Sequence, residues 1–458
     1  MTCAAGRHTR PRCPPSRAHQ STLRILGIGE DGDLGDMYAR LRRDGHEVRM
    51  YAASPEAKGI YAGIVPQSAD WQNELPWIRR AGGEGVIVFE TATYGAVQDQ
   101  LRGEGYQVVG GSAFGDRLEA DRAFGLEQLK GRGLRSAECR AFTDFDAALA
   151  FLKAYPGRYV FKSNGANSLR TRNFIGQMDS GADMTALLST YRRQWTSETR
   201  PDFVLMDHVQ GVEVGVGAYF NGERFLEPAC LDWEHKRFFS GDLGELTGEM
   251  GTIVTYRGAE RIFSLTLAPL SDALRQSGYC GYINLNLIAN DEGLWPIEFT
   301  SRFGYPGYAI CEALHLESWA SIFRKLLDGR AASIDTAPGY AAGVVLAVPP
   351  FPYRYGYDEL SRGLPISFRD TLTDSDRDAL HLAEVAMQDG QLVMSGMTGY
   401  VGVATGTGPS VDVARDRAYA LSSKVVVPNL RYRVDIGNRV INHDLAELVR
   451  LGYMDPDV

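Results

Sequence analysis

The sequence predicts a mixed α/β and α+β protein built from about three domains, as its 458 residues suggest. Residues 23–29, LRILGIG, form an apolar run that is followed by the helical DLGDMYARLRRDG and the strand-like EVRMYAA, the order typical of a βαβ unit. Further along, Asn221-Gly222 separates two apolar-rich runs, VEVGVGAYF and ERFLEPACLDW, which indicates an antiparallel hairpin. We therefore expect a parallel N-terminal sheet followed by antiparallel structure.

The N-terminal unit is predicted over residues 22–118. Two more apolar segments, GVIVFE (85–90) and YQVVGG (106–111), flank the helical GAVQDQLRGEG. Strands that alternate with helices in this way favour a small doubly wound domain with a parallel sheet.

The first strand-to-helix turn, GIGEDGDLG (27–35), has the spacing G-x-G-x-x-G that also occurs in dinucleotide-binding sites. Three acids, Glu30, Asp31 and Asp33, occupy the place where a pyrophosphate would bind. We therefore expect a structural turn, or a site for a less anionic ligand, rather than an NAD site.

The rest of the chain is predicted to form two further units, at residues 119–334 and 335–458. A helix is expected over 118–134, and further helices and strands alternate up to the hairpin at Asn221-Gly222. The last unit begins with the strand-like GYAAGVVLAVPPFP and contains the helical SVDVARDRAYALSSKVV. No internal repeat is evident.

Composition excludes several classes of function. The formal net charge of −9 argues against a nucleic-acid partner, because such domains are usually basic. The sequence contains no run of 18 or more apolar residues, so it gives no sign of a membrane-spanning helix. The six cysteines lack metal-type spacing, which fits reduced, cytoplasmic usage. Residues 1–21 are expected to be a disordered tail, with an organelle-targeting segment as the alternative.

The strongest candidate site lies in WPIEFTSRFGYPG (295–307), where Glu298 interrupts a strand-like run and Arg302 follows. If Gly293 takes the left-handed position of a three-residue loop, Asn286 on the preceding strand lies opposite Glu298. Paired oxygen ligands of this kind suit Mg²⁺, and Arg302 could hold a transferring phosphoryl group. The alternative is a Glu298–Arg302 ion pair on an edge strand.

Three other segments carry polar side chains in unusual places. Lys162 lies in the apolar strand of VFKSNGAN (160–167), before a glycine-containing loop; it is either a phosphate ligand or an edge lysine that reaches solvent. In VLMDHVQGVEVGVG (204–217), backbone groups could bind an adenine edge and Glu213 a ribose. The run LDWEHKR and the glycine-rich loop after it form either a binding segment or a solvated turn.

Together these segments resemble the ATP-grasp superfamily, and within it the phosphoribosylamine–glycine ligases, from about Leu23 to the end of the chain. The family patterns Leu-Glu-x-x-Lys-x-Phe, Asp-His-Lys-Arg, Thr-Gly-Gly-Met-Gly and Ile-Glu-Phe-Asn-x-Arg-Phe-Gly-Asp-Pro correspond here to LEADRAF, EHKR, TGEMG and IEFTSRFGYP. The C-terminal RAYAL (417–421) and RVDIG (433–437) match as well.

The resemblance implies an ATP-grasp fold with two lobes in residues 119–334, and a ligase that forms an amide through an acyl phosphate and releases ADP. It implies ATP and Mg²⁺ (or Mn²⁺) as cofactors, small-molecule amine and carboxylate substrates, and a monomer or weak homodimer. The implied catalytic residues are Arg302, Lys236 and Arg237. The implied nucleotide ligands are Arg122, Lys162, Gly165, Asp207, Val209 and Glu213, and the implied metal ligands are Glu298, Asn286 and Thr300.

Departures from the family pattern concentrate in the regions expected to bind phosphoribosylamine. The basic, glycine-rich Gly-Asn-Gly-Gly-Arg-Glu-His is replaced by the acidic GIGEDGDLG, Gly-Pro-Glu is replaced by FETATYG, and Tyr400 stands in the arginine place of Gly-Gly-Arg-Val. Within the ATP half, LRT replaces Gly-Lys-Gly, and Thr300 replaces an asparagine. Because acids repel a phosphate, the favoured function is a ligase for another amine. The alternatives are the purine-pathway enzyme itself and a nucleotide-binding homologue without catalysis.

Overall fold

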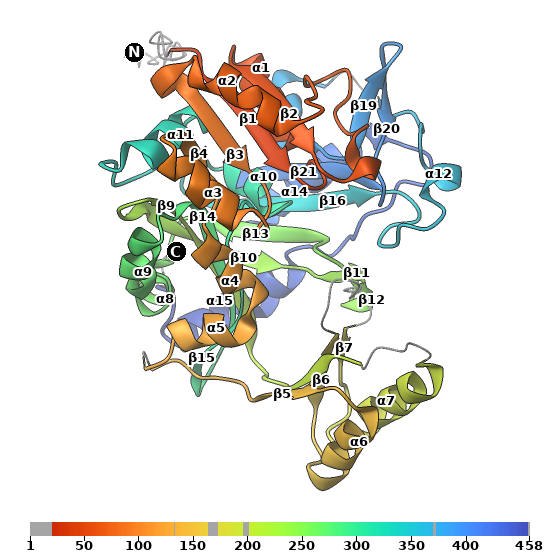
Figure 1. Ribbon diagram of the computed structural model, residues 1–458. Helices are drawn as coiled ribbons and strands as arrows, with labels where there is room; N and C mark the ends of the chain where they lie inside the picture. Colours follow the sequence, from red (N-terminus) through yellow and green to blue (C-terminus); the bar gives the residue numbers. More distant parts are fainter. Residues whose placement is uncertain (1–20, 132, 164–172, 196–200, 370–371, 457–458) are drawn as a thin grey trace, which may run out of the picture.

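The N-terminal unit forms the predicted parallel sheet in a computed structural model that describes residues 21–131, 133–163, 173–195, 201–369 and 372–456 (Figure 1). Its strand order is β2-β1-β3-β4, and every pairing is parallel. The strands are β1 (Arg24–Gly29), β2 (Glu47–Ala52), β3 (Gly85–Phe89) and β4 (Gln107–Val109), and the helices are α1 (Gly35–Arg43), α2 (Leu75–Arg79) and α3 (Gly95–Gly103). All residues of β3 are buried, as expected for a sheet with helices on both faces. The tail expected over 1–21 falls almost entirely outside the described residues.

A larger antiparallel sheet of eight strands forms the centre of the molecule. Its order is β15-β14-β9-β10-β13-β16-β21-β18. The strands are β9 (Val212–Asn221), β10 (Phe225–Glu234), β13 (Gly251–Thr255), β14 (Cys280–Asn290), β15 (Gly293–Thr300), β16 (Tyr340–Ala347), β18 (Leu380–Leu382) and β21 (Tyr400–Gly408). Because β16 pairs with β13, the sheet runs without a break across the division expected at residue 335.

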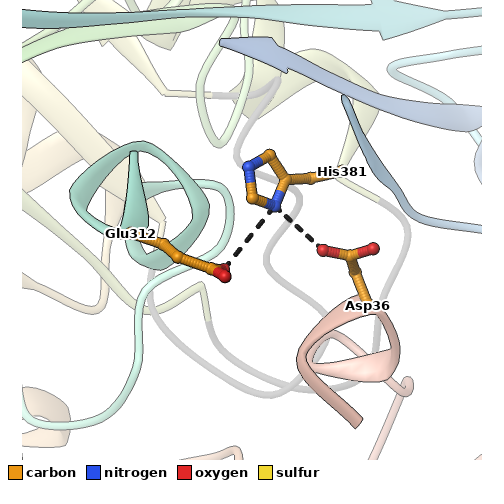
Figure 2. A group of neighbouring side chains, drawn as sticks. All are labelled: Asp36, Glu312 and His381. Atoms are coloured by element: carbon orange, nitrogen blue, oxygen red, sulfur yellow. Dashed lines mark hydrogen bonds and ion pairs between the residues drawn. The ribbon is translucent and has the colours of Figure 1, made fainter. Parts of the chain in front are cut away.

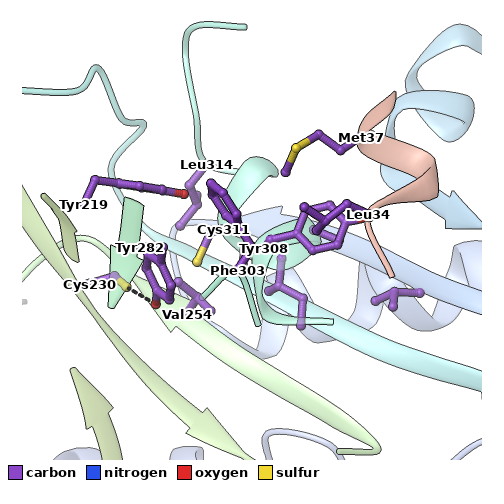
Figure 3. Close-up of a cluster of buried hydrophobic side chains, with 14 of the residues drawn as sticks. Leu34, Met37, Tyr219, Cys230, Val254, Tyr282, Phe303, Tyr308, Cys311 and Leu314 are labelled. Atoms are coloured by element: carbon purple, nitrogen blue, oxygen red, sulfur yellow. Dashed lines mark hydrogen bonds between the residues drawn. The ribbon is translucent and has the colours of Figure 1, made fainter. Parts of the chain in front are cut away.

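One hydrophobic core joins the N-terminal unit to the large sheet. Helix α10 (Gly307–Glu312) lies between them: Figure 3 shows Tyr308 and Cys311 of this helix among Leu34 and Met37 from the α1 region and Tyr219, Cys230 and Val254 from the sheet. Helices α11 (Trp319–Asp328) and α14 (Val411–Ser422) add further buried side chains to the same core.

A buried charged cluster links three parts of the chain that are far apart in sequence (Figure 2). Asp36 of α1 lies 2.5 Å from Arg40 Nε and 2.9 Å from His381 Nδ1 on β18. Glu312 of α10 lies 3.8 Å from the same histidine nitrogen and 3.5 Å from Arg40 Nη1. Arg40 also donates to the backbone carbonyls of Asp378 and Leu380. Arg40 therefore supplies the positive charge that this group of acids needs inside the protein.

A smaller lobe has a core of its own. It consists of the sheet β5-β8-β6-β7 and two helices, and Figure 1 shows it standing apart from the rest of the molecule. Its elements are β5 (Cys139–Phe142), α6 (Phe145–Ala154), β6 (Tyr159–Ser163), β7 (Phe174–Ile175), α7 (Ala182–Gln194) and β8 (Phe203–Asp207). Stacked and tilted aromatic rings around Phe203, together with Leu152 and Leu188, fill this separate core.

The single helix predicted over 118–134 is in fact two short helices, α4 (Ala113–Ala120) and α5 (Arg122–Gln128). Asp121 breaks the helix because its backbone is extended, and its side chain accepts a hydrogen bond from the Phe124 amide. An aspartate in this position competes with the helical hydrogen bonds and caps the next helix.

The remaining elements are short. They are α8 (Glu260–Leu265), α9 (Ser271–Gln276), α12 (Tyr357–Leu360), α13 (Asp374–Ala379), α15 (Leu445–Arg450), β11 (Arg237–Phe239), β12 (Leu243–Leu246), β17 (Ser367–Phe368), β19 (Val385–Gln388), β20 (Gln391–Met394) and β22 (Val425–Val426). No helix in the described ranges combines the length and the apolar character needed to cross a bilayer.

Candidate active site

A cavity of about 620 Å³ lies between the N-terminal unit and the large sheet. The turn between β1 and α1 lines one side, and β10, β14 and β15 line the other. Glu298, Asn286, Thr300, Arg302, Lys236 and Arg122, all expected site residues, line this one cavity. The structure therefore brings together half of the side chains selected from the sequence.

Asn286 and Glu298 are opposite each other, as the sequence predicted, but for a different reason. The turn between β14 and β15 has two residues, Asp291 and Glu292, and not the three that were expected. A two-residue turn alone would place Asn286 opposite Ile297. A β-bulge after Pro296 adds one residue to β15 and restores the pairing of Asn286 with Glu298.

Two glycines on β9 open the floor of the cavity. Gly215 lies in register between Asn286 on one side and Asp232 on the other. A Cβ at Gly215 would lie 2.2 Å from Asp232 Oδ1, and a Cβ at Gly217 would lie 1.9 Å from the Tyr282 hydroxyl. Side chains from β10 and β14 therefore meet above β9: Asn284 Nδ2 donates to Asp232 Oδ2 at 2.6 Å.

Lys236 is surrounded by three carboxylates on the cavity floor. Its Nζ lies 2.6 Å from Glu213, 3.3 Å from Glu234 and 3.5 Å from Glu298. Burial alone would lower the pKa of Lys236, but these three carboxylates raise it well above its ordinary value. Lys236 is therefore a permanent positive charge beside Glu298.

Two more cations approach Glu298 from the side of the small lobe. Arg122 Nη2 lies 3.6 Å and Lys162 Nζ 4.0 Å from Glu298 Oε2. Burial lowers the pKa of Lys162 to about 8, although Glu298 opposes this shift. Glu298, Arg122 and Lys162 also line a neighbouring groove of about 1010 Å³. A cluster of cations beside an open groove is a suitable place for a phosphate chain.

Arg302 does not pair with Glu298, so the edge-strand ion pair considered as an alternative is not present among the described residues. Arg302 Nε instead donates to Glu119 Oε1 of α4 at 3.1 Å, and the other oxygen of Glu119 accepts from the Ser301 amide at 2.9 Å. Glu119 thus holds Arg302 at the edge of the cavity.

One expected residue, Arg237, lies apart from this group, and another, Gly165, is not among the described residues. Arg237 lies on β11, where its side chain donates to the Gly244 carbonyl at 2.7 Å, and it does not line the cavity. The structure therefore does not place Arg237 among the reacting groups. Gly165 lies outside the described residues, so its predicted role stays a prediction.

The expected adenine-binding segment lines a cavity of about 360 Å³ between the small lobe and strands β14 and β15 of the large sheet. Asp207, Val209 and Glu213 contribute to it, together with apolar side chains such as Ile288 and Trp295. Glu213 also contacts Lys236, so this cavity adjoins the cluster around Glu298. The arrangement suits a flat ring with a polar edge.

The glycines of GIGEDGDLG have structural roles. A Cβ at Gly27 would lie 2.1 Å from the Tyr38 ring, and a Cβ at Gly29 would lie 2.2 Å from the carboxylate of Glu90. Gly32 has a φ of +74° and makes the turn itself. The spacing that resembles a dinucleotide motif is thus explained by packing.

Glu30, Asp31 and Asp33 of the same turn line the 620 Å³ cavity. Burial raises the pKa of Asp33 to about 6; Arg302 lowers it, and Asp31 raises it further. Asp31 lies 3.5 Å from Arg354. The acids of this turn therefore face the space in which Arg302 also lies.

Sequence reasoning missed four acids of the cavity, which are Asp232, Glu234, Glu249 and Glu119. Strand alternation could have identified the first two, because Asp232, Glu234 and Lys236 are spaced by two and share one face. Glu249 occupies a glycine position of the TGGMG pattern, and the Thr252 hydroxyl donates to it. Burial raises the pKa of Asp232, and Glu234 raises it further.

The sequence and the fold of this chain were compared with those of known proteins. The family model for the phosphoribosylglycinamide synthetase ATP-grasp (A) domain matches residues 120–308. A phosphoribosylamine–glycine ligase of Pseudomonas aeruginosa is 29% identical over 448 residues, which cover 93% of this chain and 100% of that protein.

Two solved structures show the same fold at lower identity. A phosphoribosylamine–glycine ligase from Thermotoga maritima superposes with a TM-score of 0.67 at 23% identity, covering 90% of this chain and 100% of that one. The biotin carboxylase domain of 2-oxoglutarate carboxylase from Hydrogenobacter thermophilus, solved with MgADP and bicarbonate, has a TM-score of 0.62 at 13% identity and covers 95% and 99% of the two chains.

Proposed function

We propose that this chain, an ATP-grasp protein distantly homologous to phosphoribosylamine–glycine ligases, is an ATP-dependent ligase that joins a carboxylate to an amine. ATP phosphorylates the carboxylate, which gives an acyl phosphate and ADP. The amine attacks the acyl carbon, an amide forms and phosphate leaves. The protein mainly positions the reactants and stabilises charge.

The single observation that carries this proposal is the set of cations around Glu298. Lys236, Arg122 and Lys162 lie within 4.0 Å of one carboxylate, which lines both the 620 Å³ cavity and the 1010 Å³ groove. In the ATP complex, the phosphates would take Lys162 and Arg122 as partners and free Glu298 to bind a metal.

The oxygen donors on β14 and β15 fit Mg²⁺ or Mn²⁺. Glu298 supplies a carboxylate, Asn286 an amide oxygen and Thr300 a hydroxyl, all on one face of the hairpin. The metal would neutralise charge on the phosphates of ATP. Asn286 Nδ2 donates to Glu234 at 3.2 Å, so its Oδ1 is the atom left for a metal.

The remaining roles follow from position. The adenine would lie in the 360 Å³ cavity against Asp207 and Val209, with Glu213 near the ribose. Arg302, held by Glu119, would stabilise the negative charge that develops at the reaction centre, and Lys236 would fix the orientation of Glu298. We place the enzyme in the cytoplasm, as a monomer or weak homodimer with no nucleic-acid or membrane partner.

The amine differs from phosphoribosylamine in this proposal. Glu30, Asp31 and Asp33 line the cavity where the family pattern is basic, and they would repel a phosphate. Tyr400 packs against Phe351 and Tyr305, at ring-centroid distances of 4.6 and 5.3 Å, in place of the family arginine. The named relatives support the runner-up, which is phosphoribosylamine–glycine ligase activity itself. The replacement of asparagine by Thr300 supports a third reading, a nucleotide-binding protein without catalysis.

An ADP-release assay tests these alternatives with the purified protein, Mg-ATP and a panel of carboxylates and amines that includes glycine with phosphoribosylamine. We expect ADP release with a non-phosphorylated amine, and none above background with phosphoribosylamine and glycine. Efficient formation of glycinamide ribonucleotide would return the protein to purine synthesis. ATP binding without ADP release from any pair would favour the non-catalytic homologue. Lys162→Ala, which removes a phosphate partner, is the negative control.

A further inference from the structure

The 620 Å³ cavity has more acids than its own cations can neutralise. Among the described residues, eight carboxylates and three cations line it. All three cations are engaged: Lys236 and Arg122 contact Glu298, and Arg302 pairs with Glu119. Arg354, which does not line this cavity, pairs with Asp31 at 3.5 Å, and the rest of the excess negative charge is left for ligands to balance.

Five of these acids come from two parts of the chain that both line the cavity. Glu30, Asp31 and Asp33 come from the β1–α1 turn, whereas Asp232 and Glu249 come from the side of the large sheet. Neither set belongs to the proposed metal ligands on β14 and β15, so a metal bound to Glu298 does not account for them.

Asp232 provides the observation that points to a ligand. Its side chain is buried, with 6% of the residue exposed, and lines the cavity. Oδ2 accepts from Asn284, but no donor among the described residues reaches Oδ1. Oδ1 lies 2.2 Å from the position that a Cβ at Gly215 would take, so the missing side chain of Gly215 makes room for this oxygen. A buried carboxylate oxygen without a donor costs stability, so a ligand that donates to it is favoured.

We propose that the amine substrate carries a second positively charged group, an ammonium or a guanidinium, which binds between Asp232 and the acids of the β1–α1 turn. This inference rests on the proposed function and specifies its substrate class as diamines and basic amino compounds. An ammonium brings three hydrogen-bond donors and one charge, and a guanidinium brings five donors and one charge. Either group supplies the donor that Asp232 Oδ1 lacks.

Calorimetry tests the proposal without knowledge of the carboxylate. The full-length protein, saturated with the Mg²⁺ complex of a non-hydrolysable ATP analogue, is titrated with 1,4-diaminobutane and with butylamine, which has the same carbon chain and one charge fewer. We expect the diamine to bind at least tenfold more tightly. Asp232→Asn and Asp33→Asn should each weaken diamine binding at least tenfold, whereas Asp455→Asn, an exposed acid near the C-terminus, should not change it.

Equal affinity for the two amines, or diamine binding that both variants leave unchanged, would overturn the proposal. Displacement of the diamine by Mn²⁺ in wild type but not in Asp232→Asn would assign the acids to a second metal instead. Asp33 lies on a partly exposed turn, so Asp33→Asn remains informative if Asp232→Asn fails to fold. ADP release with monoamines alone would leave the ligase function standing and refute the second charge. Diamine binding that depends on Asp232, without ADP release from any pair of substrates, would support the second charge and refute the ligase function.

Discussion

Replacing Glu298 by glutamine separates the two roles that this side chain can have. In the structure, Glu298 contacts Lys236, Arg122 and Lys162 at 3.5, 3.6 and 4.0 Å. It could therefore be the centre of a structural ion-pair cluster, or a metal ligand held ready by cations that ATP later removes. Glutamine keeps the shape of the side chain and removes its charge.

The structure sets the size of the structural effect. Two unit charges 4 Å apart interact by about 4 kcal/mol at an effective dielectric constant near 20. The Glu298 side chain is 41% exposed, however, and pairs with that much solvent contact contribute about 0–1 kcal/mol each. Three such pairs give a loss of no more than about 3 kcal/mol in the free energy of unfolding. Loss of a charged metal ligand, in contrast, should lower turnover by at least ~100-fold, since even residues that only support metal ligands change activity 10–100-fold.

Urea denaturation and ADP release, measured on the same preparation, distinguish the two roles. The matched control is Glu292→Gln, an exposed acid in the turn of the same hairpin. We expect Glu298→Gln to unfold within about 3 kcal/mol of wild type and to have almost no turnover. A variant that is far less stable but still releases ADP at a rate near that of wild type would show that Glu298 is a structural residue.

Three further predictions concern other parts of the structure. Because the pKa of Lys162 is about 8, ATP affinity measured by calorimetry should fall as the pH rises from 7 to 9 and the lysine loses its proton; Lys162→Arg should remove this dependence, and an equal fall in the variant would argue against it. Gly217→Ala places a Cβ 1.9 Å from Tyr282 and should lower the free energy of unfolding by about 1–3 kcal/mol, whereas Gly103→Ala, with no atom within 4 Å, should not; equal stability of the two variants would contradict this. Arg40→Met removes the counter-charge of buried Asp36 and half-buried Glu312, and it should lower the free energy of unfolding in urea by about 3–5 kcal/mol with unchanged ATP affinity. A variant as stable as wild type would show that Arg40 is not needed as their counter-charge.

The sequence predicted the fold well where local patterns and the family resemblance agreed. The parallel N-terminal sheet, the hairpin at Asn221-Gly222 and the C-terminal helix α14 are all present. The pairing of Asn286 with Glu298 was also correct, but the bulge after Pro296 that produces it has no signal in the alternation of apolar residues. The sequence analysis expected a turn one residue too long and no bulge, and these two errors compensated each other, so the predicted strand register was correct.

The candidate site was harder to predict because its chemistry depends on contacts between distant segments. The sequence gives no sign that Glu119 holds Arg302, since the two are 183 residues apart, or that Gly215 leaves room for Asp232. Arg237 was selected because it follows Lys236 in a motif, but its side chain donates to the Gly244 carbonyl and does not line the cavity that Lys236 lines. Alternation along β10 would have identified Asp232 and Glu234, which the motifs did not select.

The separate core of the small lobe has a consequence for how substrates enter and leave. The N-terminal unit, the large sheet and the C-terminal strands share one core, and the cluster of Asp36, Arg40, Glu312 and His381 fastens them together. The small lobe has its own core of aromatic side chains, so it can rotate relative to the rest of the described residues without disrupting the shared core. Lys162 travels with this lobe, whereas the acids facing the amine cavity stay fixed. If the proposed function holds, movement of the small lobe would control the rate of nucleotide exchange, while the acids that select the amine would keep their positions.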